Sequence, residues 1–236
     1  MPTLFYFLCD NFSMIKIGIT GNIACGKTTA YKIIKSAEHT IIDADDIVKE
    51  LYKNNLFIEE LSKKFTMIIS DGKINFKILS GLLFTDKDFK EKYEAFIFPK
   101  VKEKIIEFFE ANKNTKKVFV IVPLLFEAKM KDIFDNIIFI SADENIRRKR
   151  LISRNSMLSN IADKVIKSQI SEEEKIPHSD YIIKNNGTIE EFKNAVNILL
   201  NNIWTDYFLN WTCKSLSFAA AYAAKISAVE ALDKGT

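Results

Sequence analysis

Residues 21–28 carry the pattern with the most specific chemistry in the chain. Gly21, Gly26 and Lys27 are spaced as in G-x-x-x-x-G-K-[ST], and Thr28 completes the pattern. Glycine at both positions lets the backbone curl so that successive N–H groups point at phosphate oxygens. A helix that begins near Lys27 adds the positive end of its dipole to the same anion. The alternative is a glycine-punctuated turn that binds nothing, and the apolar strand before it and the helical run after it argue against that alternative.

We expect the whole loop to take part in nucleotide binding. The ammonium of Lys27 can reach terminal phosphates, and the hydroxyl of Thr28 can ligate Mg²⁺. The amide dipoles around Cys25 are expected to lower the pKa of its thiol and make it oxidisable. The predicted nucleotide-binding residues of the loop are Gly21, Asn22, Ile23, Ala24, Cys25, Gly26, Lys27, Thr28 and Thr29.

A cluster of carboxylates follows the second apolar run of the chain. Residues 39–42 read as a short strand, and Asp43, Asp45 and Asp46 come directly after it. Carboxylates at the carboxyl end of a strand face the crevice where open α/β sheets bind ligands. One of them can serve as the N-cap of the helical run that follows. For the cluster as a whole we favour catalysis over capping.

Arginine side chains recur at helical spacing further along the chain. Arg147, Arg150 and Arg154 are three and four residues apart, so they share one face of a helix. Charged runs are usually solvated helix faces. Phosphoryl transfer nevertheless needs cations against the transferring group, which the planar fork of arginine suits. We therefore expect Arg150 and Arg154 to act on phosphate.

Strands and helices must alternate to position these residues. The expected strands are 15–19, 39–42, 117–122, 136–141 and 180–184, and the expected helices are 29–37, 124–127 onward, 147–155, 156–175 and 188–203. Such alternation predicts right-handed crossovers and a parallel sheet. Residues 47–112 read as a mostly helical insertion with one turn at Asp71-Gly72, which could hold a second substrate.

Composition sets broad limits on the function. The 236 residues are 47% apolar and 28% charged, with a net charge of +3, which is ordinary for a soluble protein and does not suggest non-specific nucleic-acid binding. Scattered cysteines indicate reduced thiols in the cytoplasm. No run is long and apolar enough to span a membrane, and residues 1–13 lack the basic start of a secretory signal. That leader reads as an extension, an edge strand or a packing arm, and residues 204–236 as a helical or disordered appendage.

With these residues in place, the chain resembles the dephospho-CoA kinase family of P-loop kinases over about residues 15–203. The resemblance is carried by the loop GITGNIACGKTT, IDAD at 42–45, VPLLFE at 122–127 and RLISRN at 150–155, followed by Gln169, Lys175 and SDYIIKNNG at 179–187. The loop alone indicates only a P-loop protein. The motifs together, in this order, are specific to the family.

The resemblance implies a three-layer P-loop NTPase fold of the nucleoside-monophosphate-kinase type. It implies one domain over 14–203, with a five-stranded parallel sheet, a helical CoA-binding insertion at 47–112 and a lid at about 145–175. The implied reaction transfers the γ-phosphate of ATP, with Mg²⁺, to the 3′-hydroxyl of dephospho-CoA in a monomer or small homo-oligomer. No nucleic-acid or membrane partner is expected.

Roles carried over by position agree with those expected from the residues themselves. Asp45 becomes the base or orienting group for the hydroxyl, and Lys27 holds the phosphates. Arg150 acts from the lid and Arg154 contacts nucleotide or phosphate. The corner from Asn185 to Gly187 is implied to lie near the adenine.

Departures from the family pattern carry expectations of their own. Asn22, Ala24 and Cys25 stand where the family usually has Gly, Gly and Ser, so an intact loop should give Ala24 a negative φ. Phe98 and Phe76 stand where His and Arg are common, both on the acceptor side. Two alternatives therefore stay open: a related kinase for a nucleoside or nucleotide, and a non-catalytic ATP-binding switch.

Overall fold

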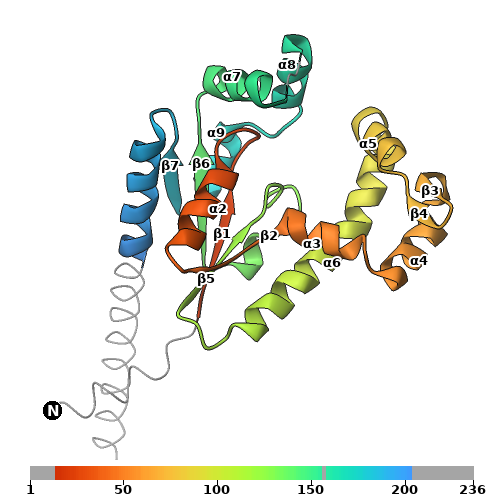
Figure 1. The fold of residues 1–236 in the computed structure, drawn as a ribbon, viewed down its shortest axis with the longest axis horizontal. Helices are drawn as coiled ribbons and strands as arrows, with labels where there is room; N and C mark the ends of the chain where they lie inside the picture. The colour runs from red at the N-terminus through yellow and green to blue at the C-terminus, as the bar shows by residue number, and fades with distance from the viewer. Residues whose placement is uncertain (1–13, 156–157, 204–236) are drawn as a thin grey trace, which may run out of the picture. The chain divides into compact units, whose positions relative to one another are not determined.

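The central feature of the fold is a parallel sheet whose middle strand leads into the glycine-rich loop. The computed structural model describes residues 14–155 and 158–203, apart from the side chains of 154 and 155. Within the unit that ends at Thr188, five strands lie in the order β2-β5-β1-β6-β7 (Figure 1). They are β1 (Ile15–Thr20), β2 (Thr40–Asp43), β5 (Lys117–Ile121), β6 (Asn136–Ser141) and β7 (Tyr181–Lys184). All four pairings are parallel, which confirms the predicted sheet.

The inner strands form because their residues are apolar on both faces. Ile17, Ile19, Phe119 and Phe139 are all buried, as expected where helices cover both sides of a parallel sheet. Predicted strand ends agree within one or two residues. Helix α2 (Lys27–Ser36) follows β1 after the six residues of the glycine-rich loop and begins at Lys27, as expected from the loop pattern.

The predicted insertion between β2 and β5 is mostly helical, as expected. It contains α3 (Ala44–Leu51), α4 (Asn55–Lys64), the 3₁₀ turn η1 (Thr66–Ile68), α5 (Phe76–Thr85) and α6 (Lys87–Ala111). A two-stranded antiparallel hairpin, β3 (Ile69–Ser70) and β4 (Lys73–Ile74), interrupts the helices. Its turn is Asp71-Gly72, whose φ angles of 51° and 72° suit a tight hairpin turn.

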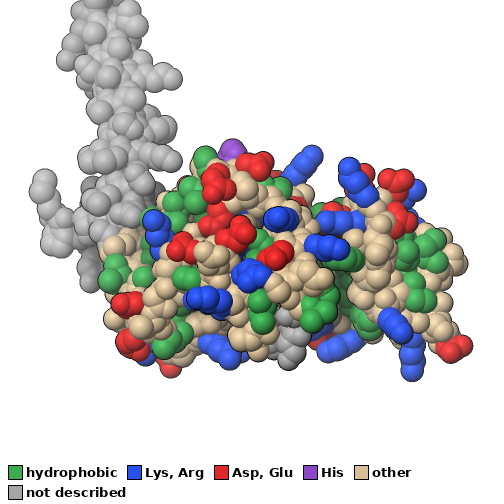
Figure 2. All heavy atoms as spheres, turned by 90° about the horizontal axis from the view of Figure 1, so that it is seen from above, with side chains coloured by type: hydrophobic (Ala, Val, Ile, Leu, Met, Phe, Trp, Pro, Cys, Tyr) green, Lys and Arg blue, Asp and Glu red, His purple; other side chains and the backbone are tan. Residues whose placement is uncertain are grey.

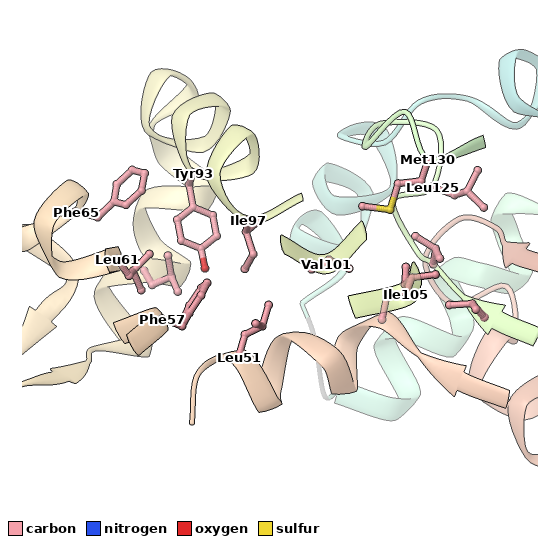
Figure 3. Packing of buried hydrophobic residues seen from close by; sticks show 14 of the residues in the cluster. Leu51, Phe57, Leu61, Phe65, Tyr93, Ile97, Val101, Ile105, Leu125 and Met130 are labelled. Carbon is pink, nitrogen blue, oxygen red and sulfur yellow. The ribbon is translucent and has the colours of Figure 1, made fainter. Parts of the chain in front are cut away.

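Helix α6 ties the insertion to the sheet. Its buried side chains recur every four residues, so one stripe faces a shared core from end to end. Near its start, Tyr93 packs against Phe65 with ring centroids 5.6 Å apart, whereas Val101 and Ile105 lie towards Leu125 (Figure 3). Side chains of the insertion and of strand β5 therefore belong to one hydrophobic cluster.

Two predicted helices are wrong in extent. Residues after Pro123 make only one helical turn, because Lys129 adopts φ 52° and the N–H of Met130 donates to the carbonyl of Leu125, which closes the turn. The 3₁₀ turn η2 (Lys131–Ile133) then leads to β6.

The segment expected as one helix over 156–175 is divided. Helix α7 (Glu144–Asn155) is followed by α8 (Ser159–Lys167). Residues 168–171 are not helical, and they separate α8 from α9 (Glu172–Lys175) and the 3₁₀ turn η3 (Ile176–His178). The hydroxyl of Ser171 caps α9 by accepting from the N–H of Glu174.

Residues 189–203 belong to a second unit and form a helix, as predicted for 188–203. The expectations for residues 1–13, 156–157 and 204–236 lie outside the described residues. No helix among the residues described is both long enough and apolar enough to cross a membrane. Positive and negative side chains are interspersed on the face seen in Figure 2, in keeping with a net charge of +3.

Candidate active site

The loop between β1 and α2 presents backbone N–H groups without protein acceptors. Helix α2 begins after Gly26, which adopts φ 117° and gives no side-chain cap. Among the residues that the structure describes, the N–H groups of Ala24, Gly26 and Thr28 have no protein acceptor. A helix start with unsatisfied amides is a site for an anion, so the loop can take phosphate oxygens.

Gly21 is required where the loop leaves β1. Its φ is 152°, and an added Cβ would lie 2.3 Å from the carbonyl oxygen of Ile140 and 2.7 Å from Sγ of Cys25. The first of these atoms is backbone and cannot move aside. The loop therefore passes β6 with room for glycine alone.

We expect Gly21→Ala to lower the free energy of unfolding by about 2 kcal/mol or more, because the methyl group meets backbone. Nucleotide affinity should fall with it. Gly81→Ala is the matched control, since Gly81 is exposed within α5 with nothing within 4 Å of an added Cβ. That change should instead stabilise the protein by roughly 0.5–1 kcal/mol. Urea unfolding measures both, and equal effects would contradict the argument.

Ala24 does not have the expected negative φ. Its φ is 59°, in the left-handed region that costs an alanine roughly 1–2 kcal/mol. The prediction was wrong because the loop needs this conformation where the family pattern has glycine. Ala24 also packs against the cluster of Leu151, Ala162 and Ile166. That packing contact and the hydrogen bonds that side chains donate to the loop carbonyls offset the free-energy cost of the left-handed backbone.

Lys27 crosses the inside of the loop. Its Nζ donates to the carbonyl oxygens of Gly21, at 2.7 Å, and Asn22, at 3.0 Å. The ammonium is thus held at the loop by two neutral acceptors that a phosphate can replace.

Cys25 is not the activated thiol expected from the sequence. The side chain is fully buried, and burial raises the pKa of its thiol, an effect that outweighs the nearby ammonium of Lys27. Desolvation disfavours the thiolate more than the charge and dipoles of the loop favour it.

We therefore expect Cys25 to react slowly with iodoacetamide at pH 8. The folded protein should be modified at this residue roughly tenfold more slowly than the protein in urea, because both thiolate fraction and access are reduced. Peptide mass spectrometry after timed quenching measures the rate. Equal rates in the two states would show an exposed thiolate instead.

The carboxylates after β2 have three different roles. Asp43 caps α3, since its Oδ1 accepts from the N–H of Asp45 at 2.9 Å, and burial raises its pKa. Asp46 pairs with Lys49 at 2.6 Å on the surface. Asp45 is exposed, and its carboxylate has no ion pair or hydrogen bond among the described residues. Capping thus explains one member of the cluster, and Asp45 is the carboxylate left for chemistry.

A groove of about 570 Å³ runs between α2, α3 and α6 beside this cluster. Asp43 and Asp46 line it, and Asp45 does not. Neighbouring helix residues point about 100° apart, so Asp45 projects from a different side of α3.

The arginines predicted to share one helix face make different contacts: one is structural, and another contacts the loop. Arg147 is buried, and its Nε donates to the carbonyl of Ala142 at 2.9 Å and lies 3.7 Å from Oε1 of Glu172. Arg150 donates to the carbonyls of Ala24 and Cys25 at 3.3 and 3.4 Å. The side chain of Arg154 lies outside the described residues.

The corner after β7 reaches the same loop. Nδ2 of Asn185 donates to the carbonyl of Cys25 at 2.7 Å, and the backbone carbonyl of Asn185 accepts from Arg150 at 2.9 Å. Gly187 is exposed at the bend that follows. The structure thus brings Arg150 and Asn185 together at the second half of the loop.

The first half of the loop is held by side chains to which the sequence assigned no role. Oε1 of Gln169 accepts from the N–H of Ile23 at 2.7 Å. Nζ of Lys175 donates to Oδ1 of Asn22 at 3.0 Å and lies 2.8 Å from Oε1 of Glu127. The only signal in the sequence was that these residues recur in the family motifs.

The residues present fit a Mg²⁺ ion that arrives with a nucleotide. The described residues contain no group of three or more His, Cys, Asp or Glu side chains arranged to hold a metal. Mg²⁺ in kinase sites instead takes substrate phosphates, waters and one or two protein oxygens. The exposed Thr28 side chain, in the first turn of α2, can supply one of them.

A parallel sheet with an anion-binding loop after its central strand defines a P-loop fold. A sequence model of the dephospho-CoA kinase family matches residues 15–191, so the chain belongs to this family. It is 36% identical over 184 residues to a dephospho-CoA kinase of Fusobacterium nucleatum, covering 76% of this chain and 93% of the relative. It is 33% identical to that of Rickettsia typhi, covering 80% and 98%.

Solved structures agree with this assignment. A dephospho-CoA kinase from Campylobacter jejuni is 30% identical, with a TM-score of 0.60 over 80% of this chain and 97% of that one. A Thermus thermophilus protein is 26% identical, with a TM-score of 0.70, and the match covers 80% and 97%.

Proposed function

We propose that the protein transfers the γ-phosphoryl group of ATP to the 3′-hydroxyl of dephospho-CoA, giving coenzyme A and ADP. The observation that carries the proposal is the pairing of an amide-lined loop after β1 with the unpaired carboxylate of Asp45 at the start of α3. Both lie at the carboxyl edge of one parallel sheet, where such sheets bind ligands.

The nucleotide side uses the loop and its neighbours. The free amides of Ala24, Gly26 and Thr28 bind phosphate oxygens, and the ammonium of Lys27 exchanges its two carbonyl partners for them. A Mg²⁺ ion, when bound by the nucleotide and Thr28, supplies charge neutralisation on the phosphates. Arg150 is 3.3 Å from a loop carbonyl and adds positive charge at the same place.

The acceptor side uses Asp45 and the insertion. The ribose hydroxyl oxygen attacks the γ-phosphorus, the bond to the β,γ-bridging oxygen breaks, and the hydroxyl proton passes to Asp45. The carboxylate of Asp45 is free to accept this proton, because Asp43 caps α3 and Asp46 forms an ion pair with Lys49. Residues 47–112 hold the rest of dephospho-CoA, and the segment at about 145–175 acts as the lid.

The remaining assignments follow from the same picture. The corner from Asn185 to Gly187 lies at the second half of the loop, where the nucleotide base emerges, so we place the adenine there. Arg154 follows Arg150 by one helical turn on α7 and contacts nucleotide or phosphate. The reaction takes place in the cytoplasm, in a monomer or small homo-oligomer that needs no membrane or nucleic acid.

The test is a panel of acceptors under identical conditions. ATP consumption should depend on dephospho-CoA and stay at background with nucleosides and nucleotides. Turnover with a nucleotide and none with dephospho-CoA would instead identify a related kinase, for which Phe76 and Phe98 on the acceptor side would be the first residues to examine. ATP binding with no turnover on any acceptor would favour a switch module.

A further inference from the structure

A buried ion pair lies directly behind the phosphate-binding loop. Lys175, at the end of α9, is only 1% exposed, and its Nζ lies 2.8 Å from Oε1 of Glu127. The same Nζ donates to Oδ1 of Asn22 in the loop, at 3.0 Å. Nδ2 of Asn22 in turn donates to the carbonyl of Ile170 at 3.2 Å. These contacts thus join three segments that are far apart in the sequence: the loop at Asn22, residues 170–175 and Glu127.

Stability alone does not account for this arrangement. Removing two charges from water is costly, and a buried pair often contributes less than apolar residues of the same volume. Here the cost is not fully recovered, because Oε2 of Glu127 is buried and has no hydrogen-bond partner in the part of the chain that the structure describes. What such a pair does well is hold a defined geometry.

The geometry that it holds is that of the loop. The carbonyl of Asn22 accepts from Nζ of Lys27 at 3.0 Å and from the N–H of Cys25 at 3.3 Å. When Lys27 turns to a phosphate, the first of these bonds is lost. The side chain of Asn22 stays fixed from behind by Lys175 and Ile170, so the loop can keep its curl. Glycine at this position could make neither contact.

We propose that Lys175 is a positioning residue, which acts through the side chain of Asn22 to keep the loop amides aimed at phosphate. Glu127 holds the ammonium of Lys175 in place through the contact of 2.8 Å. The proposal rests on the proposed function only in that the loop binds ATP.

The primary test variant is Asn22→Ala. It breaks the link to the loop and leaves the Lys175–Glu127 pair intact, and Asn22 has no positive φ that alanine would strain. Lys175→Met is the second variant, although it leaves Glu127 unpaired. Lys32→Met is the control, because Lys32 is an exposed lysine of α2 that lies outside the phosphate-binding loop and the proposed lid.

Steady-state kinetics separate positioning from a merely structural role. Asn22→Ala should raise the KM for ATP about tenfold, as loss of a supporting contact does at other sites, with kcat and the KM for dephospho-CoA within about twofold. Lys175→Met should do the same, and the double variant should be no worse than the more affected single variant. The control should match the parent. An unchanged KM for ATP in Asn22→Ala, or additive effects, would overturn the proposal.

A measurement without ligand keeps this test separate from that of the proposed function. Hydrogen exchange of the free protein should show faster exchange of the hydrogen-bonded loop amides of Ile23 and Cys25 in Asn22→Ala, with those of β1 unchanged. Equal exchange of the loop amides in variant and parent would overturn the proposal even if the parent is an active kinase. Faster exchange would support it even if dephospho-CoA is not the acceptor.

Discussion

Asp45→Asn should lower kcat with dephospho-CoA by about 10²- to 10⁴-fold, the range expected when a general base is lost. Asparagine has nearly the same shape, but its amide cannot take the hydroxyl proton. The affinity for ATP should stay nearly unchanged, because Asp45 makes no contact with the phosphate-binding loop among the described residues. Calorimetric ATP titration and steady-state turnover measure the two quantities.

Asp46→Asn is the matched control for this variant. Asp46 lies in the same first turn of α3 and forms an exposed ion pair with Lys49. Exposed ion pairs of this kind contribute roughly 0–1 kcal/mol to the free energy of unfolding. Its turnover should be close to that of the parent. If Asp45→Asn kept full turnover, the base would have to be sought elsewhere, and Asp43 would be the next residue to test.

Lys27→Met should lower kcat/KM for ATP by about 10²- to 10³-fold, as when one preorganised charge is removed from a transition state. The ammonium is positioned by carbonyls at 2.7 and 3.0 Å, which leaves it beside the amides that bind phosphate. Lys27→Arg should not restore activity, because the wider guanidinium does not fit a site built for a point charge. Both effects are read from initial rates over a range of ATP concentrations.

Lys32→Met controls for the loss of a lysine from α2. Lys32 is exposed on the same helix, one turn and a residue after Lys27. It should retain the parent's rate. Thermal unfolding should also show that Lys27→Met is folded, and a folded Lys27→Met with parental kcat/KM would contradict the role given to the loop.

Most of the fold was predictable because its signals are local. The strands that became β1, β5 and β6 are apolar runs that can only be buried, and α2 follows a loop whose glycines mark its start. The helix expected after Pro123 failed for a tertiary reason. Lys129 takes a left-handed conformation there and closes the chain into a single turn, which no propensity of lysine indicates.

The individual residues of the site could be predicted from the sequence, but the contacts between them could be predicted less well. The spacing of Gly21, Lys27 and Thr28 carries its own chemistry, and a capping role for one of the aspartates was foreseen as an alternative, although not that Asp43 would take it. The left-handed Ala24 and the raised pKa of the Cys25 thiol were not foreseen. Both depend on what packs around the loop, from segments more than a hundred residues away.

The most direct test of the account is the identity of the product made from ATP and dephospho-CoA. Phosphorus NMR and fragmentation mass spectrometry of the purified product locate the new phosphate. The account predicts one new monoester on the 3′-oxygen of the ribose, formed in equal amount with ADP and formed far more slowly with Asp45→Asn. ADP released without a phosphorylated acceptor, or a phosphate on any other oxygen, would contradict it.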